Sequence, residues 1–270
     1  MPTFNSFNNQ NNNSSSQVVY DFSNKQTKGA FLSKVFGMMF ICLLITTAVA
    51  AGFGYGFQYF LDQGATVGAD GVKVYDQNAI TVLVSVLIVD IIALLIMSFV
   101  LPIMFARGKH NIIVPLMIYV VLMGIMLSTF TFLVDWLILV EAFGITTIIF
   151  GVMGLLGYVS KGRMAGIGVI LLGLIVGAGL LCLLNWILIL TSAISTESSI
   201  ALSWVVSLLV FAFLMLVTMY DVYRIKKIAE SGASQDNNLV NYCAYILYSD
   251  FIAILIRVIY FLAIIYGKRK

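Results

Sequence analysis

Seven stretches of this chain are each long and apolar enough to cross a lipid bilayer. A transmembrane helix needs about 20 mainly apolar residues, and the candidates lie near residues 35–57, 80–105, 112–133, 137–159, 165–190, 201–222 and 243–266. Hydrophobic residues make up 61% of the 270-residue chain, against roughly half in a soluble globular domain. Since most connections between the stretches are short, the sequence predicts an all-α polytopic membrane protein with seven transmembrane helices.

The first 27 residues have a different composition. They begin MPTFNSFNNQNNNSSSQ, an Asn- and Ser-rich segment with too little apolar surface to offset the entropy of ordering. The segment also lacks the basic and apolar regions of a signal peptide. We therefore expect residues 1–27 to be a disordered cytosolic tail, which a partner protein could bind, and residues 28–270 to form the membrane domain.

Basic residues indicate the orientation of the chain. The loops opposite the N-terminus hold Lys73 as their one cation, and every other Lys and Arg outside the spans and the C-terminus lies on the N-terminal side: Lys25, Lys28, Lys34, Arg107, Lys109, Lys161, Arg163, Arg224, Lys226 and Lys227. By the positive-inside rule, the N-terminus is cytosolic and residues 58–79 form an extended external connection.

The basic C-terminus conflicts with this orientation, because seven spans would place Lys268, Arg269 and Lys270 outside. Either the first six spans fix the topology, or residues 243–266 form a re-entrant hairpin. The last segment contains no Gly or Pro that would break a helix, which favours a full span.

Five ionisable side chains interrupt the apolar stretches. A charge at the bilayer centre costs about 3 kcal/mol, so membrane proteins keep such residues where they pair, titrate or line a polar path. The five are Asp90, Glu141, Asp221, Asp250 and Arg257. The functional site is expected among them.

The chain lacks the residues that several classes of enzyme require. The three cysteines have no CxxC spacing and are interpreted as small buried hydrophobes; they are Cys42, Cys182 and Cys243. A single histidine, His110, argues against Ser/His proteolysis and histidine-based metal sites. An intramembrane aspartyl protease would need two facing aspartates, which Asp221 and Asp250 supply, but neither has the flanking pattern of those enzymes. We expect no enzymatic activity, no cofactor and no nucleic-acid partner.

Two of the aspartates are predicted to lie at similar depth. Asp221 is near the cytosolic end of the sixth span, and Asp250 is about 10 Å from the start of the seventh at 1.5 Å per residue. If the sixth helix continues through residues 223–228, the two carboxylates can meet. Such a pair titrates as a unit and, when deprotonated, offers oxygens suited to calcium. The alternative is that Asp221 caps its helix and pairs with Arg224.

A second charged pair is predicted deeper in the membrane. Arg257 lies seven residues beyond Asp250 on the same helical face, about 10 Å further along the helix. Asp90 lies at comparable depth near the middle of the second span. The sequence therefore predicts an ion bridge between Asp90 and Arg257, either as a gate or as a structural contact. Glu141, near the outer end of its span, is expected to extend to the membrane interface.

Five segments in order resemble the Bax inhibitor-1 family, also called transmembrane Bax inhibitor motif proteins. They are FLSKVFGMMFICLLITTAVA at 31–50, MGIMLSTF at 123–130, AFGITTIIFGVMGLLGYVSK at 142–161, YDVYRIKKI at 220–228 and LYSDFIAILIR at 247–257. The chain is similar to a bacterial-type member from about residue 31 to its end. The resemblance implies a seven-helix bundle in which the C-terminal helix is central.

The resemblance also implies a function. It indicates a pH-sensitive calcium leak in the plasma membrane of a bacterium, with Asp221 and Asp250 as the pH sensor and calcium-binding residues, and membrane lipid and calcium ions as partners. Some bacterial members instead modulate a membrane protease, so the alternative is a non-conducting regulator that binds a protease or another protein. The family has a basic residue about one turn beyond Arg257, where this chain has Tyr260, which leaves a gating role for Arg257 open.

Overall fold

The computed structural model describes residues 25–67, 73–108, 111–160, 165–190, 196–230 and 237–267. The elements within these ranges are α1 (Lys25–Gln63), β1 (Thr66–Val67), β2 (Lys73–Val74), α2 (Gln77–Ala106), α3 (Ile113–Ser128), α4 (Phe130–Leu133), α5 (Trp136–Val159), α6 (Ala165–Leu190), α7 (Thr196–Glu230) and α8 (Asn237–Gly267). Residues 1–24 of the predicted tail and the basic C-terminus, Lys268 to Lys270, lie outside the described residues.

The predicted helical membrane architecture is confirmed, but six helical segments rather than seven qualify as spans in the described part of the chain. They are α1, α2, α3 together with α4, α5, α7 and α8. The remaining predicted span, residues 165–190, is present as α6, although several of its side chains lie outside the described residues. α6 packs against α7 and against none of the other described helices.

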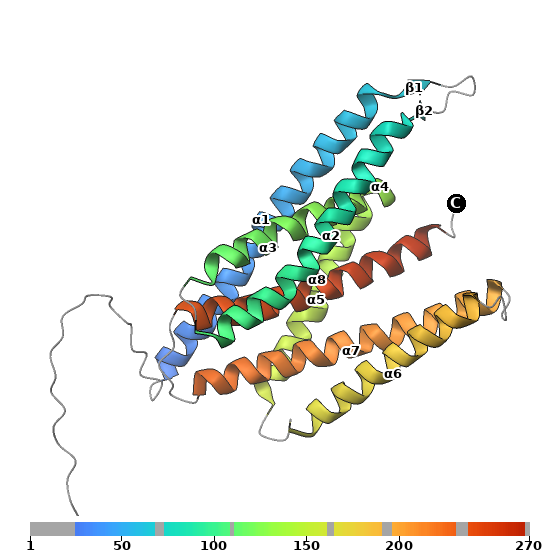
Figure 1. The fold of residues 1–270 in the computed structure, drawn as a ribbon. Helices are drawn as coiled ribbons and strands as arrows, with labels where there is room; N and C mark the ends of the chain where they lie inside the picture. Colours follow the sequence, from blue (N-terminus) through green and yellow to red (C-terminus); the bar gives the residue numbers. More distant parts are fainter. Residues whose placement is uncertain are drawn as a thin grey trace, which may run out of the picture.

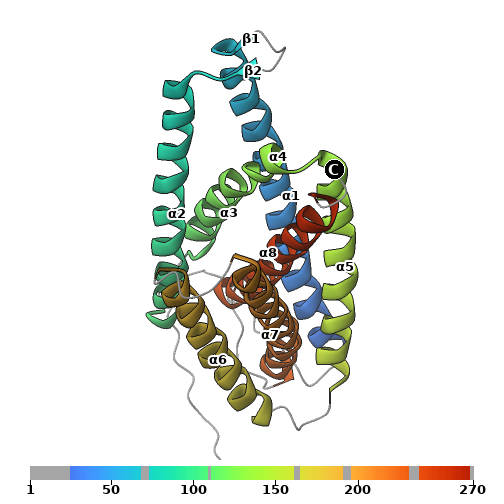
Figure 2. The same ribbon diagram turned by 90° about the vertical axis from the view of Figure 1, so that its right-hand side faces the viewer.

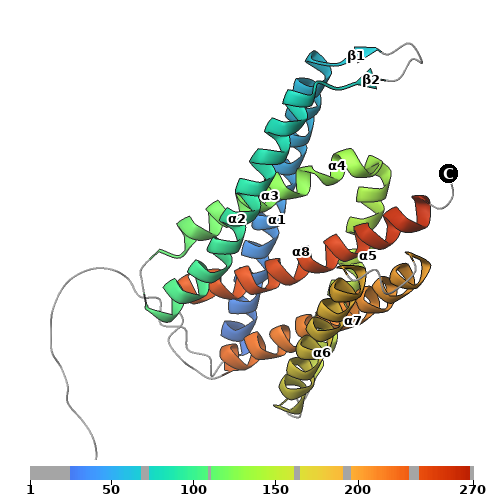
Figure 3. The same ribbon diagram turned by 45° about the vertical axis from the view of Figure 1, so that its right-hand side comes forward.

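The first two helices extend further than their apolar stretches predict. α1 has 39 residues, about 58 Å at 1.5 Å per residue, nearly twice the hydrocarbon thickness of a bilayer. The antiparallel strands β1 and β2 connect its C-terminal end to α2, and Asp76 caps α2 by accepting a hydrogen bond from the Asn78 backbone N–H at 3.2 Å. The predicted external loop is therefore largely helix and hairpin, and it projects beyond the bundle (Figures 1 and 3).

α8 lies at the centre of the bundle. It contacts α1, α2, α3, α5 and α7, and Figure 2 shows it crossing the middle of the molecule between α2 and α5. A helix that is apolar around its circumference is suited to such enclosure. Its buried apolar residues face every direction: Val240, Cys243, Ala244, Tyr245, Leu247, Tyr248, Phe251, Ile252, Ile254, Leu255, Val258 and Ile259. The central C-terminal helix that the family resemblance implies is thus present as α8.

The glycines of the GVMGLLG segment on α5 have different surroundings. A Cβ on Gly157 would press against the carbonyl oxygen of Met219 on α7, so glycine is needed for this close approach. Gly154 has ordinary clearance, with its nearest atom in Val222 at 3.9 Å from the position of a Cβ. Gly151 faces open space. The contact at Gly157 therefore sets how closely α7 lies against α5.

Candidate functional site

Asp221 of α7 and Asp250 of α8 are in contact. Their carboxyl groups form a hydrogen bond with each other. α7 continues to Glu230, so the helical extension through residues 223–228 that this contact requires is present, and Asp221 does not cap its helix. An ionised carboxylate can only accept hydrogen bonds, so a hydrogen bond between two carboxyl groups requires a proton on one of them. The predicted proximity is present, and the roles in pH sensing and calcium binding stay predictions.

The aspartate pair is largely surrounded by protein, and one cationic side chain lies near it. The Oδ2 atom of Asp250 is buried and has no hydrogen-bond partner. The guanidinium of Arg224, one turn along α7, interacts electrostatically with Asp221 and also with Tyr242 and Cys243 of α8. Arg224 therefore balances part of the charge of the pair, and one buried oxygen of Asp250 has no hydrogen-bond partner among the described residues.

Asp250 is the last of three consecutive polar residues that connect α8 to three different helices. Successive helical residues point about 100° apart. Tyr248 accordingly meets Thr46 of α1, with 2.6 Å between the two hydroxyl oxygens, Ser249 bonds with Tyr119 of α3, and Asp250 bonds with Asp221 of α7. We call Tyr248, Ser249 and Asp250 the polar layer of α8.

The direction of one of these hydrogen bonds follows from the number of protons that each hydroxyl can donate. The hydroxyl of Thr46 donates its single proton to the backbone carbonyl of Val120 at 3.3 Å, and therefore Tyr248 donates to Thr46. Sequence reasoning singled out Asp250 and missed Tyr248 and Ser249. The signal was present as the run Tyr-Ser-Asp within an apolar stretch.

The predicted ion bridge between Asp90 and Arg257 is absent from the structure. Asp90 is 4% exposed, and neither of its carboxylate oxygens has a hydrogen-bond partner. The reason lies in the helix arrangement, since α2 packs mainly against α3. α2 and α8 meet where α2 ends and α8 begins, at the stacked rings of Phe105 and Tyr242 with centroids 4.0 Å apart, and then diverge (Figure 1).

Glu141 lies at a helix contact. Its Oε2 atom accepts a hydrogen bond from the Tyr266 hydroxyl at 2.9 Å. This bond joins the beginning of α5 to the end of α8. The sequence did not identify this partner, and the extension of Glu141 towards the membrane interface stays a prediction.

The described residues hold no group of three or more His, Cys, Asp or Glu side chains that could bind a metal ion. A calcium ion at the aspartate pair would have two carboxylates as its acidic ligands, whereas calcium prefers six to eight oxygens. The pair is therefore suited to a brief contact with a cation and not to holding one tightly.

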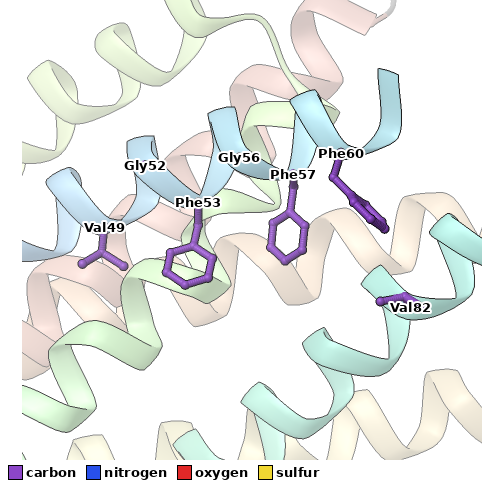
Figure 4. Close-up of a pocket in the computed structure, with 7 residues that line it drawn as sticks. All are labelled: Val49, Gly52, Phe53, Gly56, Phe57, Phe60 and Val82. Carbon is purple, nitrogen blue, oxygen red and sulfur yellow. The ribbon is translucent and has the colours of Figure 1, made fainter. Parts of the chain in front are cut away.

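Two apolar grooves lie outside the polar layer. One, of about 640 Å³, is formed between the C-terminal half of α1 and the first turns of α2 by glycine, phenylalanine and valine residues: Val49, Gly52, Phe53, Gly56, Phe57, Phe60 and Val82 (Figure 4). The other, of about 610 Å³, lies between α1 and α5, and includes Val222 and Phe251. These two residues directly follow Asp221 and Asp250 in the sequence, so the second groove adjoins the helices of the aspartate pair.

Known proteins similar to this chain match it over most of its length. The family model described as inhibitor of apoptosis-promoting Bax1 matches residues 28–267. The inner membrane protein YbhL of Escherichia coli K12 is 27% identical over 245 residues, which cover 89% of this chain and 92% of YbhL. YbhL of Escherichia coli O6:H1 strain CFT073 matches to the same extent. The family match extends from α1 to α8, and it includes both helices of the aspartate pair.

Proposed function

Because the chain belongs to the Bax inhibitor-1 family, we propose that it is a pH-sensitive calcium leak channel whose conduction is controlled by Asp221 and Asp250. The observation that carries this proposal is the hydrogen bond between the two carboxyl groups. Each carboxyl belongs to a different membrane-spanning helix. A proton bound by the pair therefore links pH to the contact between α7 and α8.

The chemistry of the pair supports competition between protons and calcium. With a proton the two carboxyls attract each other, and without it two neighbouring anions repel unless a cation lies between them. Calcium needs the deprotonated oxygens, so acid weakens its binding. The unpartnered Oδ2 atom of Asp250 is available to the cation. The small number of acidic ligands favours a permeant ion over a stored one.

The proposal also states which membrane holds the chain, that α6 crosses it, and how the chain is oriented. YbhL is an inner membrane protein by name, and we place this chain in the same membrane of a bacterium. α6 also crosses the membrane and brings the number of spans to seven, and the N-terminus is cytosolic by the positive-inside rule. Asn78 lies at the start of α2, and Gly108 lies just beyond its other end. In a variant without native cysteines, a cysteine at Asn78 should react with an impermeant thiol reagent in intact cells and one at Gly108 should not; equal labelling would refute the orientation.

Calcium flux through the purified protein in liposomes, measured across pH, tests the proposed activity. The full chain should conduct in a pH-dependent manner, and deletion of residues 1–27 should leave the flux unchanged. The double variant Asp221→Asn with Asp250→Asn should lose the pH dependence. Absence of flux from the full chain at every pH would refute the channel and favour a non-conducting regulator that binds a membrane protease or another partner.

A further inference from the structure

The groove between α1 and α5 arises from the way both helices pack. Over their described lengths the backbones of α1 and α5 do not pack closely against each other, and each packs against α7 and α8. The space between them has Val222 of α7 and Phe251 of α8 at its base. Its volume of about 610 Å³ lies within the range of typical ligand pockets, roughly 300–1,000 Å³. A ligand in this groove would be held between two helices from the membrane-spanning part of the chain.

The walls of the groove are apolar along most of their length. Phe36 and Phe40 of α1 line it together with Phe150 and Gly151 of α5. The hydroxyl of Thr147, one of the few polar groups in the lining, already donates to the Phe143 carbonyl at 2.8 Å. Since the groove opens on the surface of membrane-spanning helices, the medium that meets it is hydrocarbon. Such a surface favours an acyl chain.

A cation, Lys226, contacts a residue that lines one end of the groove but does not line the groove itself. Tyr158 of α5 lines that end, and the ammonium of Lys226 donates to the Tyr158 carbonyl at 2.6 Å while lying 5.2 Å from the centroid of its ring. An ammonium has three donors, so two stay available beyond this bond. Basic pockets between transmembrane helices bind the head groups of anionic lipids.

We propose that the α1–α5 groove binds an anionic phospholipid, with one acyl chain between the helices and the phosphate at Lys226. The apolar length and the single cationic end match the two parts of such a lipid. The α1–α2 groove has a similar volume, but glycine, phenylalanine and valine form its whole lining (Figure 4), so it lacks a contact for a head group. This lipid site goes beyond the proposed channel activity and does not depend on it.

The test counts lipids that stay bound to the purified protein. The full chain is reconstituted into nanodiscs with equal amounts of phosphatidylglycerol and phosphatidylcholine, released into detergent and examined by native mass spectrometry. We expect it to retain phosphatidylglycerol in preference to phosphatidylcholine. Gly151→Leu should reduce the retained lipid about tenfold, the effect of losing contacts with about two methylene groups, because its side chain enters the open space of the groove.

Two glycines provide matched controls. Gly144 on α5 also faces open space but does not line the groove, and Gly56 lines the α1–α2 groove. Gly144→Leu and Gly56→Leu should retain lipid as the unmodified chain does. Lys226→Gln keeps a donor for the Tyr158 carbonyl and removes the charge, so the preference for phosphatidylglycerol should fall about fivefold, as expected for one surface cation.

Thr147→Phe narrows the same groove from a different position and guards against a folding defect in Gly151→Leu. If both groove variants retain as much lipid as Gly144→Leu, the groove is not the binding site and the proposal fails. An unchanged preference for phosphatidylglycerol in Lys226→Gln would remove the head-group contact. Loss of lipid in both groove variants, with retention in both controls, supports the site.

Discussion

Asp250 of α8 and Asp90 of α2 are both aspartates in apolar helices, yet their surroundings differ. Asp250 hydrogen-bonds with a second carboxyl from α7, whereas both oxygens of Asp90 are buried without a partner. α8 is central and buries residues around its circumference, while α2 buries Ala79, Asp90, Leu94 and Leu101 along one side. The comparison teaches that a carboxylate becomes a candidate site when a neighbouring helix brings it a partner, and not by burial alone.

The largest expected difference between the two aspartates is in the pH response of the calcium leak. Asp250→Asn should abolish the response over about pH 5.5–8, the range for a carboxyl pair that shares a proton, whereas Asp90→Asn should preserve it. The measurement is calcium flux in liposomes. Asp221→Asn should match Asp250→Asn, and the double variant should be little worse than either, since the residues act as one unit. A flattened profile in Asp90→Asn would assign the titration to α2 instead.

The next largest effect concerns the packing that holds α7 in place beside the pair. Gly157→Ala forces a methyl group against the Met219 carbonyl and should destabilise the protein by about 3 kcal/mol, at the upper end for overpacking. Gly151→Ala, six residues earlier on the same helix, enters open space and should stabilise it by up to about 1 kcal/mol through helix propensity. Unfolding in mixed micelles measures both. Equal effects would show that α5 and α7 are not in close contact at Gly157.

Replacement of the unpartnered carboxyl should have a smaller effect with the opposite sign. Asp90→Leu removes a buried polar group without a hydrogen bond, and should stabilise the protein by about 2 kcal/mol. The sequence-based ion bridge predicted instead that loss of Asp90 would be destabilising, because Arg257 would be left unpaired. Asp250→Leu is the matched comparison and should destabilise, because it leaves Asp221 without its partner. Destabilisation by Asp90→Leu would mean that Asp90 has a partner in the membrane.

The smallest expected effect is at the polar layer of α8. Tyr248→Phe removes the hydrogen bond to Thr46 and should cost about 1 kcal/mol, the usual net value of one such bond. Tyr260→Phe, at a position 39% exposed on the same helix, should change stability by less than about 0.5 kcal/mol. The free energy of unfolding distinguishes the two. A larger cost at Tyr260 would place the anchoring contact of α8 nearer its end.

The sequence predicted the aspartate pair because the argument depended on depth alone. The constant rise of a helix places Asp221 and Asp250 at one level, and α7 and α8 are consecutive and packed together. The same reasoning failed for Asp90 and Arg257, because equal depth does not specify which helices are neighbours. The bond between Glu141 and Tyr266 was missed for that reason too, since α5 and α8 are far apart in the sequence.

The sequence by itself determined the membrane class and the helical segments, because insertion into lipid depends on the composition of each segment and on satisfying its own backbone hydrogen bonds. The tertiary structure alone decided which side chains meet. In one short segment of α5, Gly157 permits contact with α7 and Gly151 leaves a groove open. The physical reason is that such contacts depend on the direction in which each residue points and on the helix packed there, and neither is encoded in the local composition.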